Sequence, residues 1–253
     1  HRRGHNYLTV VVDHDSGRLV WARAGRNKKT MEAFFDDLGE RRCAQIRLVS
    51  ADAADWIGDV VADRCTNAVR CMDPFHVVQW VTDALDEVRR DVWNSARRAG
   101  QKAVAKELKG ARYALWKNPE DLTERQQGKL ADIAKTNQRL YRAYLLKEQL
   151  RQVFHQDTAE DAIALLDRWL AWASRSQLPA FVKLARSIRK HKTRIHAALI
   201  HGLSNARVES LNQKLRLIMR RAFGFRSVEA LIGLAMLAHG GLCPPLPGRV
   251  TTA

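Results

Sequence analysis

Two acidic residues lie where a carboxylate is able to act on phosphodiesters. Glu209 is the only acid in residues 204–225, a segment that otherwise carries several cations. Asp52 comes two residues after the end of a strand predicted at residues 45–50. Carboxylate oxygens bind Mg²⁺ together with substrate phosphates, and two-metal phosphoryl transfer needs acids from different elements. Because acids at strand ends are common, residue types and spacing alone give only a weak indication of such a site.

Each acid also has a structural interpretation. Asp52, with Ser50, is of the residue type that caps a helix, and a helix is predicted to begin near Trp56. Asp55 is the rival acid for the same role, and we interpret it as a first-turn acid that answers the helix dipole. Glu209 has possible partners on a solvated helix face, namely Asn205, Arg207 and Gln213. The residues alone leave both interpretations open.

The segment around Glu209 predicts an amphipathic helix. Apolar residues recur at three- and four-residue steps, at Val208, Leu211, Leu215, Leu217 and Ile218. Ser204 and Asn205 are N-cap types before it, and Gly224 is a stop signal after it. Arg216 follows Glu209 by seven residues, about two helical turns. The two side chains should therefore project from nearly the same side.

The first part of the chain alternates strands with helices. Strands are predicted at residues 7–13, 18–23, 45–50 and 67–72, with helices at 30–38 and 56–63. This order predicts an α/β sheet with a parallel portion, in which functional residues gather at carboxyl ends of strands. Asp52 and Asp73 lie at two such ends. Beyond them the periodicity is helical, at residues 77–98, 102–116, 124–154, 159–174, 178–198 and 228–238.

The composition indicates a basic globular protein. The net charge is +16 over 253 residues, of which 46% are hydrophobic. Such a charge implies a polyanionic partner, either nucleic acid or an anionic membrane. No apolar run is long enough to span a bilayer, and no basic helix has a lipid-facing stripe with Trp anchors. The four cysteines lack Cys-x-x-Cys spacing, so we expect reduced thiols in an intracellular protein.

Four sequence words occur in a fixed order. They are RRGHNYLTVVVDHDSGRLVW at residues 2–21, VSAD at 49–52, DPFH at 73–76 and SNARVESLNQKLRLIMRRAFGF at 204–225. Over almost its whole length the sequence resembles the catalytic domain of DDE transposases of bacterial insertion sequences, most closely the ISL-three group. The resemblance implies a ribonuclease-H-like α/β fold, with a mixed sheet and a large all-helical insertion. The implied parts are the first part of the core (residues 1–76), the insertion (77–200), the C-terminal core helices (201–240) and a tail (241–253).

The resemblance also implies roles for individual residues. Asp52 matches the second acid of the triad and Glu209 the third, and together they would hold two Mg²⁺ or Mn²⁺ ions. The family's first acid falls just upstream of His1, so we expect a piece of a longer protein that lacks it. Arg216 matches a basic residue that meets DNA near the cleaved phosphate. The expected DNA-binding residues are Arg207, Asn212, Lys214, Arg216, Arg220 and Arg221, and the expected supporting residues are Asp73, His76 and Asn205.

The function implied is metal-dependent DNA strand cleavage and strand transfer during transposition. The partners would be transposon-end and target DNA, with no membrane. The protein would be a homo-oligomer in the bacterial cytoplasm, associated with the nucleoid. Two alternatives stay open: a catalytically dead remnant that only binds DNA, and a ribonuclease-H-like nuclease without strand transfer.

Overall fold

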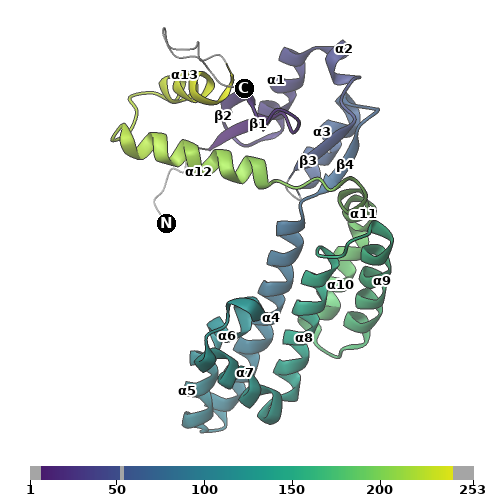
Figure 1. The fold of residues 1–253 in the computed structure, drawn as a ribbon, viewed down its shortest axis with the longest axis vertical. Helices are drawn as coiled ribbons and strands as arrows, with labels where there is room; N and C mark the ends of the chain where they lie inside the picture. The colour runs from purple at the N-terminus through teal and green to yellow at the C-terminus, as the bar shows by residue number, and fades with distance from the viewer. Residues whose placement is uncertain (1–6, 52–53, 242–253) are drawn as a thin grey trace. The chain divides into compact units, whose positions relative to one another are not determined.

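The computed structural model describes residues 7–51 and 54–241 (Figure 1). The described residues divide into two compact units. Unit 1 contains the described residues up to Arg70 together with residues 204–241, and unit 2 contains Cys71–Leu203. The protein is an α/β protein that is mostly helical, with few strand residues.

Unit 1 carries the strands and the helix with Glu209. Its elements are β1 (Leu8–Val12), β2 (Leu19–Ala24), α1 (Lys28–Leu38), α2 (Glu40–Cys43), β3 (Leu48–Ala51), α3 (Asp55–Arg64), α12 (Ala206–Arg221) and α13 (Val228–His239), and β4 (Val69–Met72) begins at its boundary. The predicted hairpin is confirmed: β1 and β2 pair antiparallel, with Val10 opposite Ala22. The predicted strands and helices of residues 30–72 are also present, with ends shifted by a few residues.

The hairpin is covered by helices on both faces. On one face Leu8, Val10 and Val12 of β1 pack against the core formed by Leu19 with α12 and α13. On the other face Val11 packs against the core of α1 and α3. Successive strand residues point to opposite faces of a sheet, so the apolar run of β1 supplies both cores. This packing fixes α12 against the strands.

We expected one mixed sheet, but the strands in the described part of the chain do not form one. β1 pairs with β2, and β3 pairs with β4, in two separate two-stranded sheets. β3 and β4 each contain four residues, so each offers few positions for ladder hydrogen bonds. The pairing of β3 with β4 is extended by the Val69 amide, which donates to the Arg47 carbonyl at 2.8 Å. A ribonuclease-H-like sheet therefore stays a prediction.

Unit 2 is all helical beyond the end of β4. Its helices are α4 (Pro74–Arg98), α5 (Lys102–Gly110), α6 (Arg112–Trp116), a 3₁₀ turn at Pro119–Asp121, α7 (Glu124–Thr136), α8 (Gln138–Val153), α9 (Ala159–Arg175), α10 (Pro179–Lys190) and α11 (Lys192–His201). α4 contacts α8 and α10, and α9 contacts the same two helices, which closes a four-helix arrangement (Figure 1). Its interior contains fully buried side chains such as Leu85, Leu146, Trp169 and Phe181.

Three long predicted helices are each divided in two. The predicted helices at residues 102–116, 124–154 and 178–198 break at Ala111, Asn137 and His191. Asn137 shows the cause most clearly, because its side-chain oxygen accepts the Leu140 amide at 2.9 Å and begins a new helix. Apolar periodicity did not reveal these breaks, since the helices on both sides of each break bury apolar residues.

A buried lysine ties α8 to the loop after α6. Lys147 is 1% exposed, and its ammonium donates to the carbonyls of Leu115 and Lys117 at 3.2 and 3.0 Å. The ammonium also pairs with the Glu148 carboxylate, which accepts from Arg151 as well. Burial lowers the pKa of Lys147, and the Glu148 carboxylate opposes that shift. These hydrogen bonds satisfy the buried charges, so we assign this cluster a structural role.

Candidate active site

The helix α12 places Glu209 on the surface of unit 1. Leu211 and Leu215 are buried against the hairpin, and Val208 and Ile218 are half-buried beside them. The prediction that Leu217 belongs to this face is wrong, since its side chain is 50% exposed. Successive helix residues are rotated by about 100°, so Leu217 lies a full step away from Ile218 and outside the buried stripe.

The N-terminal end of α12 is joined to the end of β3. The Ser50 hydroxyl donates to the Asn205 side-chain oxygen at 2.6 Å, and Asn205 is 8% exposed. Asn205 occupies the N-cap position of α12, but its side chain makes no capping hydrogen bond. It is therefore a contact between two elements that are 155 residues apart in the chain, instead of the local cap that its residue type predicts.

The Glu209 carboxylate is exposed in the first turn of α12. No hydrogen bond or ion pair joins its side chain to any residue that the structure describes. The alternative in which Glu209 pairs with Asn205, Arg207 or Gln213 is therefore not found in this part of the chain. The partial positive charge of a helix N-terminus favours an acid here, and the exposed carboxylate is open to a ligand.

The predicted DNA-binding side chains of α12 do not all lie on one face of the helix. Arg216 and Arg220 follow Glu209 by seven and eleven residues, so they share its stripe along the exposed face. Burial lowers the pKa of His239 in α13, and the charge of Lys214 adds to that shift, which associates Lys214 with this flank of the helix. The remaining members are Arg221, exposed on the Lys214 flank, Asn212, half-buried on the opposite flank, and Arg207.

Arg207 lies against the β1–β2 turn. A methyl group placed on Gly17, whose φ is +70°, would come within 2.9 Å of an Arg207 guanidinium nitrogen. The turn itself is held by Asp13, whose carboxylate accepts the Ser16 amide at 3.0 Å. Hydrogen bonds from Ser16 lower the pKa of Asp13. The geometry therefore gives Asp13 a turn-forming role and places Arg207 beside the hairpin, away from the stripe of Glu209.

Asp52, the other predicted catalytic acid, lies outside the described residues. Its distance from Glu209 therefore stays a prediction. Asp55, its rival, is the exposed first-turn acid of α3. Within the part of the chain that the structure describes, no three His, Cys, Asp or Glu side chains gather as a metal site would require.

The predicted supporting residues of the DPFH word lie in unit 2. Asp73 is 2% exposed, and its carboxylate accepts the Phe75 amide at 3.3 Å as the N-cap of α4. His76 is half-buried in the first turn of α4, with its amide bonded to the Asp73 carbonyl. The capping contact explains why an Asp precedes Pro74, since Pro is favoured at the first helical position.

The C-terminal end of α12 departs from the prediction. The amides of Phe223 and Gly224 donate to the carbonyls of Arg220 and Met219 at 3.2 and 3.1 Å, the hydrogen-bond pattern of a Schellman motif. Its left-handed position is Phe223, with φ 53°, whereas we had expected Gly224 to end the helix. Glycine is the usual residue at that position, so the predicted end of the helix lies one residue too far along the chain.

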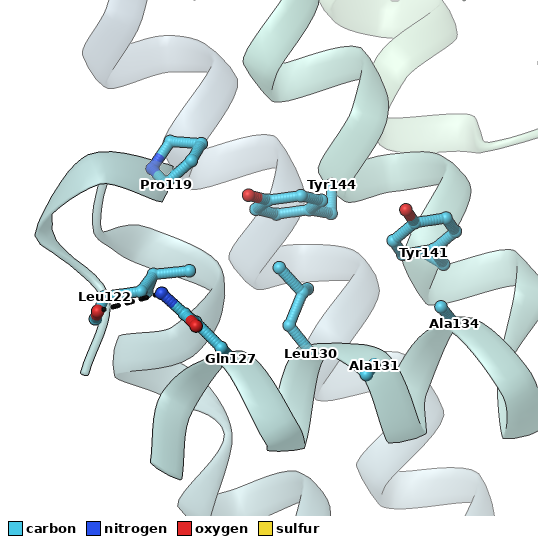
Figure 2. Close-up of a pocket in the computed structure, with 8 residues that line it drawn as sticks. All are labelled: Pro119, Leu122, Gln127, Leu130, Ala131, Ala134, Tyr141 and Tyr144. Atoms are coloured by element: carbon cyan, nitrogen blue, oxygen red, sulfur yellow. Dashed lines mark hydrogen bonds between the residues drawn. The ribbon is translucent and has the colours of Figure 1, made fainter. Parts of the chain in front are cut away.

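A separate apolar pocket lies in unit 2 between α7 and α8 (Figure 2). Its volume is about 370 Å³, and Tyr141 and Tyr144 of α8 lie over Leu130 and the alanines of α7. Burial raises the pKa of Tyr144 to about 12. The lining residues carry no ionised group: Pro119, Leu122, Gln127, Leu130, Ala131, Ala134, Tyr141 and Tyr144. This pocket therefore lacks the carboxylates that phosphoryl transfer requires.

The described cysteines are reduced thiols, and the described helices include no membrane span. Cys43, Cys65 and Cys71 are free and buried. Burial, with a smaller contribution from Cys43, raises the pKa of the Cys65 thiol to about 11, so it stays protonated and unreactive at neutral pH. Across the described residues, none of the helices combines the length and the hydropathy needed to cross a membrane.

Comparison with known proteins decides the family. The model of a family described as transposase, the ISL3 type of DDE transposases, matches residues 1–234. The chain belongs to this family. It is 58% identical over 268 aligned residues to the transposase for insertion sequence element IS1557 of Mycobacterium tuberculosis, covering 98% of the chain. It is 28% identical over 228 residues to the transposase for IS1001 of Bordetella parapertussis, covering 90% of the chain.

The chain matches only part of each relative. The chain spans 60% of the length of the IS1557 transposase and 56% of the IS1001 transposase. No solved structure matches the chain. Sequence similarity thus establishes the relationship to insertion-sequence transposases.

Proposed function

We propose that this chain forms part of the catalytic domain of a transposase, which cleaves DNA strands at the ends of an insertion sequence and joins them to target DNA. Asp52 and Glu209 are the metal-holding acids in this proposal. The observation that supports it most is the 2.6 Å hydrogen bond from Ser50 to Asn205, because it joins the segments that carry the two acids.

The lengths of these segments limit the distance between the acids. Asp52 follows Ser50 by two residues, which reach at most about 7 Å. Glu209 follows Asn205 by four residues, a rise of about 6 Å along the helix. Two carboxylates attached so close to one hydrogen bond are able to approach a common ligand, which neither the sequence spacing nor the charge pattern could indicate.

The donor set fits a divalent cation of the magnesium class. The Glu209 carboxylate is exposed and makes no bond with a described side chain, and carboxylate oxygen is the ligand type that Mg²⁺ and Mn²⁺ prefer. Asp52, Glu209 and a further acid of the complete protein would hold the ions. When bound, two such ions stabilise the attacking and leaving oxygens of an in-line phosphoryl transfer.

The residues of α12 have separate tasks in this mechanism. Glu209 fixes the reacting end of the helix, while Arg216 and Arg220 extend along the same stripe and bind phosphates of the DNA that passes over it. Arg207 supports the arrangement by packing on the hairpin turn. A DNA backbone lying along this stripe would bring one phosphodiester to Glu209.

The test is strand cleavage by the complete protein that contains this chain. Removal of a metal-holding acid loses several kcal/mol of transition-state stabilisation, so Glu209→Gln and Asp52→Asn should each lower cleavage of insertion-sequence ends by at least about 100-fold. DNA affinity should stay within about twofold, because the phosphate-binding cations remain. The control is Glu229→Gln, an exposed first-turn acid of α13, which should leave cleavage unchanged.

Three results would contradict the proposal. Full cleavage by Glu209→Gln would remove Glu209 from the site. A wild-type protein that binds DNA without cleaving it would indicate a remnant with DNA-binding function only. Hydrolysed products without joined target DNA would indicate a nuclease that lacks strand transfer.

A further inference from the structure

Phe223 is a large apolar side chain that contacts nothing else in the described structure. Its exposed fraction is 100%, the highest among the exposed large hydrophobic side chains. It occupies the left-handed position of the Schellman motif that ends α12, with φ 53°. A left-handed conformation is unfavourable for a residue with a Cβ, because the Cβ then lies too close to the following carbonyl oxygen. Glycine has no Cβ and avoids this cost.

Neither packing nor local geometry accounts for this residue. A fully exposed phenyl ring contributes no burial to unit 1, and the next residue, Gly224, is of the type that suits position 223 better. Strained residues concentrate at functional sites because a surrounding structure has to hold them there. The observed outlier therefore suggests a role in binding.

The cations around Phe223 indicate what it binds. Arg220, Arg221 and Arg226 are exposed, and none of them is bonded to a side chain that the structure describes. An apolar protein surface would leave three guanidinium groups without water or counter-charge. DNA presents the complementary arrangement, an apolar stack of bases between two rows of phosphates.

We propose that Phe223 stacks on the exposed face of a nucleobase in DNA, while Arg220, Arg221 and Arg226 bind the flanking phosphates. This proposal rests on the proposed DNA function of the chain. It adds a residue that binds where the face of a base is exposed. Apolar side chains inserted at base steps and aromatic rings stacked on unpaired bases are both established modes of binding. The shared requirement is a base face that is not covered by its neighbour.

The experiment measures DNA affinity of the 253-residue chain by fluorescence anisotropy. Three probes of one sequence are compared: an intact duplex, a duplex with a central mismatch, and the single strand. Loss of one stacked base weakens binding by about 5- to 150-fold, so Phe223→Ala should lose this factor on at least one probe. Phe223→Tyr should restore the affinity, because an exposed ring tolerates a hydroxyl group.

The pattern of losses identifies where the base face comes from. A loss on the intact duplex indicates insertion at a paired step, a loss on the mismatched duplex indicates stacking at an opened step, and a loss on the single strand indicates an unpaired base. The salt dependence of binding should be the same for Phe223→Ala and wild type, since no phosphate contact is removed. Arg221→Gln should instead lower the slope of log K against log salt by about 0.9 on duplex DNA.

Two controls separate binding from folding. Tyr113→Ala removes another exposed aromatic residue that follows an arginine and should not change affinity. Phe223→Gly relieves the left-handed strain and should melt at the same or a higher temperature than wild type, yet bind as weakly as Phe223→Ala.

Equal affinity of Phe223→Ala and wild type on all three probes would overturn the inference and leave the proposed function standing. A change in sedimentation of Phe223→Ala with unchanged DNA affinity would also overturn it, because Phe223 would then cover a second protein chain. Absence of DNA binding by the wild-type chain would also overturn the inference, while strand cleavage by the complete protein tests the proposed function separately.

Discussion

The hydrogen bond between Ser50 and Asn205 should stabilise unit 1 measurably. An internal hydrogen bond contributes about 1 kcal/mol net, and a buried partner left unsatisfied costs about 1–3 kcal/mol. Ser50→Ala leaves the Asn205 oxygen, 8% exposed, without this donor. Asn205→Ala also removes its other contacts, so it should destabilise unit 1 more than Ser50→Ala does. We expect a coupling energy of about 1 kcal/mol between the two substitutions.

A double-mutant cycle isolates this coupling. Hydrogen exchange of the amides in β3 and α12 gives the free energy of opening for the segments concerned, without interference from unit 2. The wild type, both single variants and the double variant are compared. As a control, Ser50→Ala is combined with Ser227→Ala, which removes the cap of α13 at the Ala230 amide. Those two sites share no partner, so their effects should add to within about 0.5 kcal/mol.

The outcome decides whether the two segments are joined in solution. A coupling energy within about 0.3 kcal/mol of zero would refute the reasoning, because independent sites behave in that way. A coupling near 1 kcal/mol predicts a second effect on cleavage by the complete protein. Ser50→Ala should then reduce the rate, and Ser50→Thr, which keeps a hydroxyl group, should recover part of it.

Three further predictions concern unit 2. Lys147→Ala should destabilise it by about 2–5 kcal/mol in urea unfolding, because a cavity replaces the buried side chain and the Leu115 and Lys117 carbonyls lose their donor; Lys147→Met should be milder, since its side chain fills most of the cavity. Between pH 10 and 12 the folded state keeps the Tyr144 proton that the unfolded state loses. Stability therefore falls as the pH rises through this range, and Tyr144→Phe should remove that part of the slope in melting curves. Trp169→Phe should cost about 1–3 kcal/mol in urea unfolding, because the buried Leu146 carbonyl loses its indole donor at 2.7 Å.

Most elements of the fold were predictable because their apolar periodicity reports burial directly. In β1, Leu8, Val10 and Val12 face one core and Val11 faces the other. The continuous apolar run of this strand therefore predicts that both faces of the hairpin are covered. The helix breaks were less predictable. One asparagine in a run with helical periodicity does not by itself indicate a break. Only the hydrogen bond from the Leu140 amide to the Asn137 side chain shows that a new helix begins there.

The arrangement of the residues in the candidate site was only partly predictable, and their roles stay predictions. Glu209 and Arg216 share one stripe, as their seven-residue spacing predicts. The contribution of Ser50 was missed, because a serine before a predicted helix is usually interpreted as a local cap. Its actual partner, Asn205, is 155 residues away, and a contact of that range cannot be found from one sequence without its fold.

The two ends of α12 violate local rules in the same way. Asn205 makes no capping bond, which forgoes about 1 kcal/mol of helix stability, and Phe223 occupies a position that favours glycine. Natural sequences break such rules mainly where function requires it. At the N-terminal end the compensation is visible, since Asn205 holds the end of β3. At the C-terminal end Phe223 is fully exposed to solvent, and the proposed contact with a nucleobase would supply the compensation. Under the two proposals, this helix would carry the metal-holding Glu209 at one end and the base-contacting Phe223 at the other, with Arg216 and Arg220 between them.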